Sequence, residues 1–186
     1  MTLTVIGSFV SPYVRKVLAC LELKGLDYAV DPITPFFGNE EFSRLSPLRR
    51  IPVLIDGDTV LSDSSVICAY LDEAYAGYAL LPEGPSARAR ARWFEEFADT
   101  RLGDLFIWGL FYQKIVHPLV WGEPGDQARI DKTLGEDLPG ALDYLEGQLP
   151  PTGFLFDDVF PHRLDLGSAD GKNPVTGLPR KIPEIR

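Results

Sequence analysis

The sequence of 186 residues contains little cysteine and histidine, with two residues of each. Cys20 and Cys68 lie far apart in the sequence and form no C-x-x-C motif. The sequence therefore predicts neither a disulfide framework nor a zinc site, and we interpret both cysteines as small core residues in a reducing compartment. His117 and His162 are also isolated, so we expect no metal site built from them.

Positive charge and long apolar runs are scarce as well. The 18 basic residues are outnumbered by 27 acidic ones, which gives a net charge of −9. This balance argues against nucleic-acid binding and anionic-membrane binding, because both require basic patches. No apolar run approaches the roughly 18 residues of a membrane span, and residues 1–7 lack the features of a secretory signal. We therefore expect a cytoplasmic protein.

The first half of the chain alternates strand and helix patterns. Ser11 before Pro12 is typical of a helix start, and Gly25 is typical of a helix end. The Asp56-Gly57-Asp58 sequence indicates a tight hairpin turn. The predicted elements are a strand at 3–7, a helix at 12–24, a strand at 27–33, a short helix at 39–45, strands at 53–55 and 59–61, and a helix up to residue 74 that Ser62 or Asp63 caps.

The second half of the chain differs in character. A linker rich in glycine and proline at 77–85 leads to a long helical stretch at 86–116 and another at 126–149, broken or kinked near Pro139 and Gly140. The residues from 158 onward show no sustained apolar period. We therefore predict a domain at 1–76, a linker at 77–85, a helical domain at 86–157 and an irregular tail at 158–186.

Three motifs follow one another in the first half of the chain: Ser11-Pro12-Tyr13-Val14-Arg15-Lys16-Val17, Ser46-Pro47-Leu48-Arg49-Arg50-Ile51-Pro52-Val53-Leu54, and Asp63-Ser64-Ser65-Val66-Ile67 followed by Tyr70-Leu71-Asp72-Glu73. In this order and spacing they resemble the amino-terminal domain of cytosolic glutathione transferases, especially serine-type classes such as tau and zeta and their bacterial relatives. The resemblance implies a thioredoxin-like α/β domain, βαβ-α-ββα, followed by an all-α domain. That second domain is expected to be incomplete, because the family's further helices have no counterpart after residue 149.

The resemblance implies that Ser11 stabilises the thiolate of glutathione. Lowering a thiol pKa of about 8.5 by two units requires about 2.7 kcal/mol. A helix amino terminus contributes about 0.3 to 2 kcal/mol and a charge-assisted hydrogen bond about 1.5 to 3, so the two together suffice. Ser11 is the expected catalytic residue, and a plain helix cap is its structural alternative. Ser8 is a weaker candidate, and Tyr13 either contributes a hydroxyl or packs at the mouth of the site.

The same resemblance implies the contacts to the rest of the tripeptide. Pro52 is expected to be cis, and Val53 after it is expected to pair its backbone with the cysteinyl unit of glutathione. Ile51 is also expected to contribute to glutathione binding. Asp63 and Ser64 are expected to hold the ammonium and carboxylate of the γ-glutamyl unit, although Asp63 can also be read as a helix cap. Arg50 is the candidate for the glycyl carboxylate, with Arg49 as a substitute; a solvated surface arginine is the alternative for either.

An aromatic stripe in the second half is mostly expected in the core, with Trp108 and Tyr112 lining an electrophile pocket. The stripe comprises Trp93, Phe97, Phe106, Trp108, Phe111 and Tyr112. The implied function is a homodimeric transferase that conjugates glutathione to small hydrophobic electrophiles, or isomerises or reduces them with it, without a metal. The alternative is a non-catalytic glutathione-transferase-like binding or scaffold module. A thiol-disulfide oxidoreductase is disfavoured, because Ser11 cannot form a mixed disulfide.

Overall fold

The computed structural model describes residues 2–33, 40–150 and 155–156. The chain divides into two compact units, the first ending at Leu80 and the second beginning at Leu81. The predicted tail at 158–186 lies outside the described residues, as do residues 34–39 between the second strand and the second helix.

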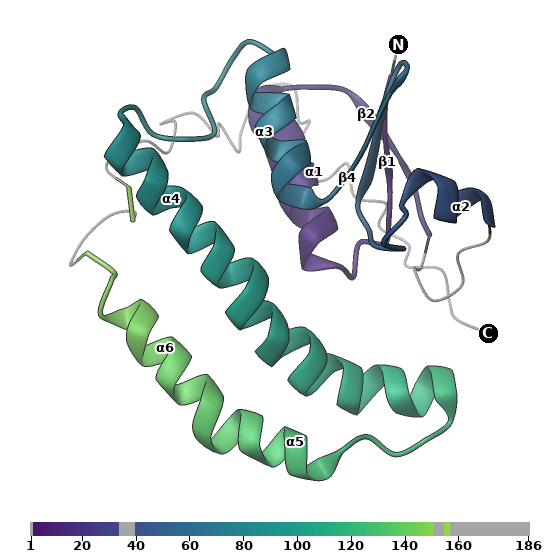
Figure 1. The fold of residues 1–186 in the computed structure, drawn as a ribbon, viewed down its shortest axis with the longest axis vertical. Coiled ribbons are helices and arrows are strands. Elements are labelled where there is room, and N and C mark those ends of the chain that lie inside the picture. Colours follow the sequence, from purple (N-terminus) through teal and green to yellow (C-terminus); the bar gives the residue numbers. More distant parts are fainter. Residues whose placement is uncertain (1, 34–39, 151–154, 157–186) are drawn as a thin grey trace, which may run out of the picture. The chain divides into compact units, whose positions relative to one another are not determined.

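The first unit has the predicted order of elements, so the thioredoxin-like arrangement is confirmed (Figure 1). Its elements are β1 (Leu3–Ile6), α1 (Pro12–Lys24), β2 (Tyr28–Asp31), α2 (Glu40–Leu45), β3 (Val53–Asp56), β4 (Thr59–Ser62) and α3 (Ser64–Ala74). The sheet order is β2-β1-β3-β4. Strand β1 is parallel to β2 and antiparallel to β3, which is antiparallel to β4.

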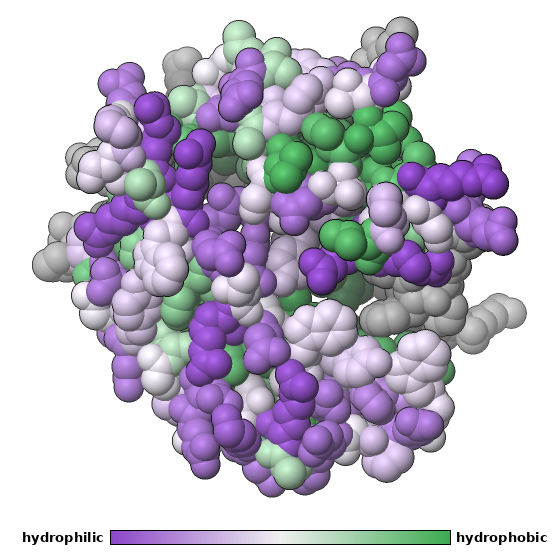
Figure 2. Space-filling view, in the orientation of Figure 1, coloured by the Kyte–Doolittle hydropathy of each residue, from purple (hydrophilic) through white to green (hydrophobic). Residues whose placement is uncertain are grey.

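The alternation of side chains along the strands builds a core on each face of the sheet. Leu3, Val5 and Leu54 pack with α1 and α3 on one face. Ile6 and Val53 pack with Phe42 of α2 on the other face. Figure 1 shows α1 and α3 on one side of the sheet and α2 on the other, and Figure 2 shows hydrophobic residues gathered over the sheet.

The ends of α1 are fixed by the residues that the sequence indicated. Ser11 is the N-cap and Pro12 occupies the first turn, while Gly25 ends the helix in the left-handed conformation at φ 66°. Gly7 lets the start of α1 approach β1, because a Cβ at this position would lie 2.5 Å from Cγ2 of Val14. The loop between β1 and α1 is therefore tightly constrained.

A buried lysine holds the end of α3 and the chain that follows. The Lys24 side chain is 1% exposed, and its Nζ lies 3.0 Å from Oδ1 of Asp72. The same ammonium donates to the carbonyl oxygens of Tyr75 at 3.0 Å and Tyr78 at 3.1 Å. The backbone N–H of Leu80 donates to Asp72 as well, at 2.9 Å. This charge is buried with its acceptors in place, as a buried ion requires.

The second unit is helical throughout its regular elements, as predicted, but three of its segments are π-helical. It comprises α4 (Pro85–Phe97), η2 (Ala98–Leu102), η3 (Asp104–Trp121), α5 (Gln127–Lys132), η4 (Thr133–Asp137) and α6 (Leu138–Glu146). No break occurs near Pro139, because η4 continues directly into α6 and Pro139 lies in the first turn of α6. Proline suits this position because it lacks the N–H that a first turn leaves unused.

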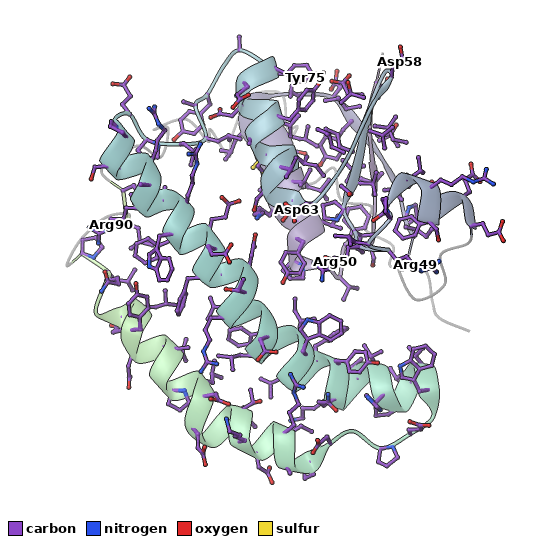
Figure 3. All side chains as sticks on the ribbon, viewed as in Figure 1. Arg49, Arg50, Asp58, Asp63, Tyr75 and Arg90 are labelled. Carbon is purple, nitrogen blue, oxygen red and sulfur yellow. The ribbon has the colours of Figure 1, made fainter. Side chains whose placement is uncertain are left out.

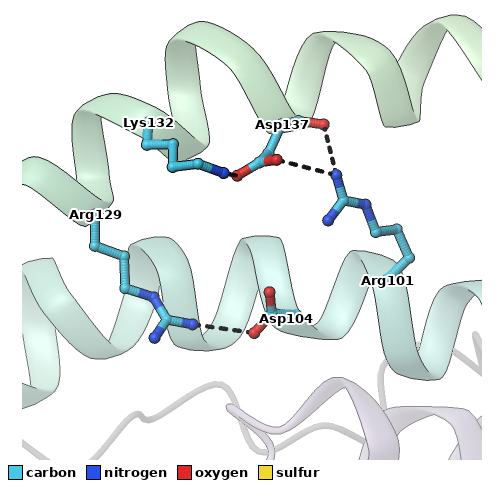
Figure 4. Close-up of polar contacts among 5 residues, drawn as sticks. All are labelled: Arg101, Asp104, Arg129, Lys132 and Asp137. Atoms are coloured by element: carbon cyan, nitrogen blue, oxygen red, sulfur yellow. Dashed lines mark hydrogen bonds and ion pairs between the residues drawn. The ribbon is translucent and has the colours of Figure 1, made fainter.

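Polar pairs join the helical segments before and after the bend at residues 122–126 (Figure 4). Arg129 lies 3.0 Å from Asp104, and Arg101 lies 3.3 Å from Asp137. Lys132 lies 2.7 Å from Asp137, and this hydrogen bond is the main cause of the lowered pKa of the Asp137 carboxyl. These pairs are solvent-accessible, so each contributes little to stability.

The aromatic stripe is mostly exposed, which corrects the expectation that most of it lies in the core. Trp93, Phe106, Trp108 and Phe111 are each at least 38% exposed. Within the described part of this unit, the buried positions of η3 follow another spacing: Leu105, Gly109, Gln113 and Val116. Gly109 faces Thr133 of η4, where a Cβ would lie 2.6 Å from the threonine hydroxyl oxygen. The face of η3 that packs against η4 therefore carries a glycine, and the large aromatic side chains lie on other faces of η3.

Candidate functional site

Strand register brings the predicted site residues of the first unit to one edge of the sheet. Ile6 at the end of β1 lies opposite Val53 at the start of β3, which lies opposite Ser62 at the end of β4. Ser11 follows the first of these positions in the chain, and Asp63 follows the last. One edge of the sheet therefore carries both helix starts.

Ser11 has the geometry of an N-cap with a remaining donor. Its Oγ accepts a hydrogen bond from the backbone N–H of Val14 at 3.4 Å, and its carbonyl accepts from Arg15 at 3.1 Å. Its own backbone N–H donates to the carbonyl of Ser8 at 3.0 Å. The cap uses a lone pair of the hydroxyl oxygen and not its proton, so a half-buried Ser11 can cap α1 and still donate a hydrogen bond.

The loop before β3 is organised by a serine whose role sequence reasoning did not identify. Ser46 is fully buried, and its Oγ donates to the carbonyl of Arg50 at 2.8 Å and accepts from the N–H of Arg50 at 3.0 Å. Its carbonyl also accepts from the N–H of Arg49 at 2.8 Å. The sequence feature that could have indicated this role is the serine directly before Pro47, because such a pair is typical of a turn.

The Ile51–Pro52 peptide bond is cis, as predicted. The position of Val53 does not suit the backbone pairing that was predicted for it. Val53 is fully buried in β3, between Ile6 of β1 and Ser62 of β4, so neighbouring strands occupy both sides of its backbone. Ile51 is half-buried and lies outside β3, which begins at Val53.

Asp63 caps α3, which was the structural alternative for this residue. Its Oδ1 accepts from the N–H of Ser65 at 2.9 Å and from the N–H of Val66 at 3.1 Å. Its backbone has φ 88°, a conformation that non-glycine residues adopt rarely and that is enriched at functional sites. Ser64 follows at 4% exposure, in the first turn of a helix amino terminus. Such a position favours a carboxylate ligand.

The two arginines differ in their surroundings. Arg49 has φ 52° and donates to Oγ of Ser43 on α2 at 2.5 Å. Arg50 is exposed, and Figure 3 labels both Arg50 and Asp63, the residue that precedes α3. Tyr13 is half-buried in the first turn of α1. Arg49 is therefore held against α2, whereas Arg50 is exposed to solvent.

The predicted electrophile residues belong to the second unit. The rings of Trp108 and Tyr112 lie 5.3 Å apart, and the Tyr112 hydroxyl accepts from Nε1 of Trp121 at 3.3 Å. The Tyr112 ring also meets the His117 ring edge-on at 4.9 Å. Their role in an electrophile pocket stays a prediction.

Two comparisons with known proteins identify the family. The family model described as "Glutathione S-transferase, N-terminal domain" matches residues 5–79. Glutathione S-transferase 3 of Zea mays is 35% identical over 159 residues, which cover 83% of this chain and 70% of that protein. The chain belongs to the glutathione S-transferase family. Another glutathione S-transferase, from Hyoscyamus muticus, is 30% identical over 92% of this chain and 81% of that protein.

Solved glutathione S-transferase structures share the fold of this family member. Glutathione S-transferase III in its apo form superposes with a TM-score of 0.70 at 34% identity, covering 86% of this chain and 74% of that chain. Glutathione transferase F7 of Populus trichocarpa gives a TM-score of 0.71 at 31% identity, covering 83% and 74%. These likenesses support a thioredoxin-like first unit followed by a helical second unit.

The described residues provide neither a metal cluster nor a membrane span. Among them, no group of three or more histidine, cysteine or acidic residues is placed to hold a metal ion. Within the same residues, no helix is both long and apolar enough to span a bilayer.

Proposed function

We propose that this chain binds glutathione at the edge of the sheet that carries the starts of α1 and α3, and transfers it to small hydrophobic electrophiles. The observation that carries the proposal is the geometry of Ser11. Its hydroxyl oxygen caps α1 by accepting from Val14, and the hydroxyl proton is not used by that bond. A donor at a helix start is what a thiolate requires.

Both contributions from Ser11 are needed for the chemistry. A thiol with a pKa near 8.5 is largely protonated at neutral pH, and lowering it by two units requires about 2.7 kcal/mol. The amino terminus of α1 contributes about 0.3 to 2 kcal/mol, and the hydroxyl donor about 1.5 to 3. A thiolate held in this way can attack the electrophile directly.

The remaining contacts distribute the tripeptide along the edge. Asp63 meets the γ-glutamyl ammonium through its second carboxylate oxygen, because Oδ1 is engaged by the cap. Ser64 and the start of α3 meet the γ-glutamyl carboxylate. The cysteinyl backbone pairs with Ile51 in place of Val53, whose backbone lies within the sheet. Arg50 meets the glycyl carboxylate.

The proposal has three further parts. Trp108 and Tyr112 contribute to the electrophile pocket, the protein acts in the cytoplasm, and two copies form a homodimer. Glutathione is a co-substrate and no metal takes part. Conjugation is proposed ahead of isomerisation, since the similar proteins reported above are named transferases.

The test compares Ser11→Ala with the unmodified chain. The variant keeps Pro12 and the start of α1, so calorimetry should show glutathione binding with a modest change in affinity. The thiolate ultraviolet band of the complex should titrate about one to two pH units higher, and conjugation of chlorodinitrobenzene at neutral pH should fall about tenfold or more.

Ser8→Ala is the matched control, because Oγ of Ser8 also accepts a backbone N–H, that of Val10 at 3.4 Å. We expect this variant to keep the thiol titration and the turnover. If Ser11→Ala keeps both as well, Ser11 is only a helix cap. Glutathione binding without turnover in the unmodified chain would favour the binding-module alternative.

A further inference from the structure

Helices α1 and α3 contact each other through three side-chain pairs, which are spaced about one helical turn apart along both helices. These pairs are Lys16 with Ser65 at 3.0 Å, Cys20 with Cys68 at 3.2 Å, and Lys24 with Asp72 at 3.0 Å. The spacing is four residues along α1 and three to four along α3, which keeps each set on one helical face. The polar pairs on either side therefore hold the two sulfur atoms opposite each other.

The two cysteines lie close together, which the sequence analysis did not predict. Both are thiols that are not joined in a disulfide, both are half-buried, and both pack against the core between the helices and the sheet. The two Sγ atoms lie 3.2 Å apart. A disulfide needs about 2.05 Å, so the sulfurs must approach by about 1.2 Å, which side-chain rotation and small helix shifts can supply.

We propose that Cys20 and Cys68 form an oxidative modification site that hydrogen peroxide converts to a disulfide between α1 and α3. One thiolate attacks a peroxide oxygen, the O–O bond breaks and hydroxide leaves, which places a sulfenic acid on that sulfur. The second thiolate attacks this sulfur, the S–S bond forms, the S–O bond breaks and a second hydroxide leaves. The sulfurs lose two electrons, the peroxide becomes two waters, and the two thiol protons are consumed in forming them.

The bond would close a loop between residues 48 positions apart in the sequence. A link of this length restricts the unfolded chain, so oxidation should raise the thermal midpoint, by about 5 °C or more for a chain of this size. The link needs no bound glutathione. Its test is therefore independent of the proposed transferase function.

The experiment treats the full chain, at low protein concentration, with hydrogen peroxide. Intact mass should fall by two hydrogen atoms, and tryptic digestion should give residues 17–24 joined to residues 51–88. Dithiothreitol should restore both thiols and lower the thermal midpoint to its original value. Dimedone, which traps sulfenic acids, should give little adduct with the unmodified chain, because the neighbouring thiol captures the intermediate.

Cys20→Ala and Cys68→Ala are the matched variants, since each leaves one thiol without its partner. In at least one of them peroxide should produce a dimedone adduct, followed by sulfinic acid at the remaining cysteine. The joined peptides from the unmodified chain test for the disulfide directly, even if a variant fails to fold. If both thiols persist under peroxide, or each gains two oxygen atoms without forming the link, the proposal is wrong.

Discussion

Replacing Asp63 with asparagine separates the two roles assigned to this residue. Its Oδ1 accepts from the N–H groups of Ser65 and Val66 at 2.9 and 3.1 Å, and an asparagine carbonyl oxygen can accept both bonds. Asparagine also tolerates positive φ, which matters at φ 88°. The cap therefore survives in Asp63→Asn, and only the negative charge is lost.

The expected magnitudes differ between stability and binding. Loss of the charge near the start of α3 should lower the free energy of unfolding by about 0.3 to 1 kcal/mol. Loss of a charge-assisted bond to the γ-glutamyl ammonium should weaken glutathione binding by about 1.5 to 3 kcal/mol, roughly 10- to 150-fold. Asp63→Ala removes the cap as well, so it should also lower the free energy of unfolding by about 0.5 to 2 kcal/mol.

The assay pairs urea unfolding with calorimetry of glutathione binding for the two variants. We expect both variants to lose a similar amount of affinity for glutathione. Only Asp63→Ala should also lose the free energy of unfolding that the cap contributes. If Asp63→Asn binds glutathione as tightly as the unmodified chain, Asp63 is a cap alone and the assignment of the ammonium to it is refuted.

Three further changes test other contacts. Arg50→Ala should weaken glutathione binding by about 1.5 to 3 kcal/mol in calorimetry, because a charge-assisted bond is lost. The hydrogen bond to Asp56 at 2.6 Å, together with burial, raises the pKa of Tyr75 to about 12, so this contribution to stability is present below pH 10 and lost as pH rises through about 12. The pKa of Asp56 is lowered, mainly by tyrosine hydrogen bonds, so stability from that carboxylate is lost as acidification passes its folded pKa. Gly109→Ala should lower the thermal midpoint, since overpacking costs about 1 to 3 kcal/mol.

Each of these changes has a control within the chain. Arg49→Ala should affect binding less than Arg50→Ala, and equal small effects would place both arginines in solvent. Asp56→Asn should shift the tyrosinate titration of Tyr75 towards pH 10, and an unchanged titration would contradict the assigned cause. Gly140→Ala introduces a methyl group with nothing within 4 Å, so it should be tolerated. A Gly109→Ala chain as stable as this control would show that the neighbouring side chain moves without cost.

The sequence predicted those parts of the fold that local chemistry determines. Ser11 with Pro12 starts α1 and Gly25 ends it, because capping and left-handed backbone are properties of single residues. The Gly57 turn between β3 and β4 is determined in the same way. The cis bond before Pro52 was predicted from the family resemblance and is present.

Contacts between elements far apart in the sequence could not be predicted from local sequence patterns. The meeting of Cys20 and Cys68 depends on the relative register of two helices, which no spacing in the sequence reveals. The position of Val53 between two strands depends on sheet order, which the sequence pattern did not supply. Phe106 was expected in the core and is exposed because η3 packs against η4 along another face, and the π-helical turns depart from the 3.6-residue period of an α-helix.

The acceptors around Lys24 determine where the first unit can be cut for separate expression. Its ammonium uses the Tyr78 carbonyl at 3.1 Å, and the N–H of Leu80 donates to Asp72, the partner of that ammonium. A fragment that stops at residue 76 lacks both of these bonds and leaves a buried charge with fewer acceptors. Removing partners of a buried charge is costly, so the shortest fragment that retains this anchor ends at Leu80.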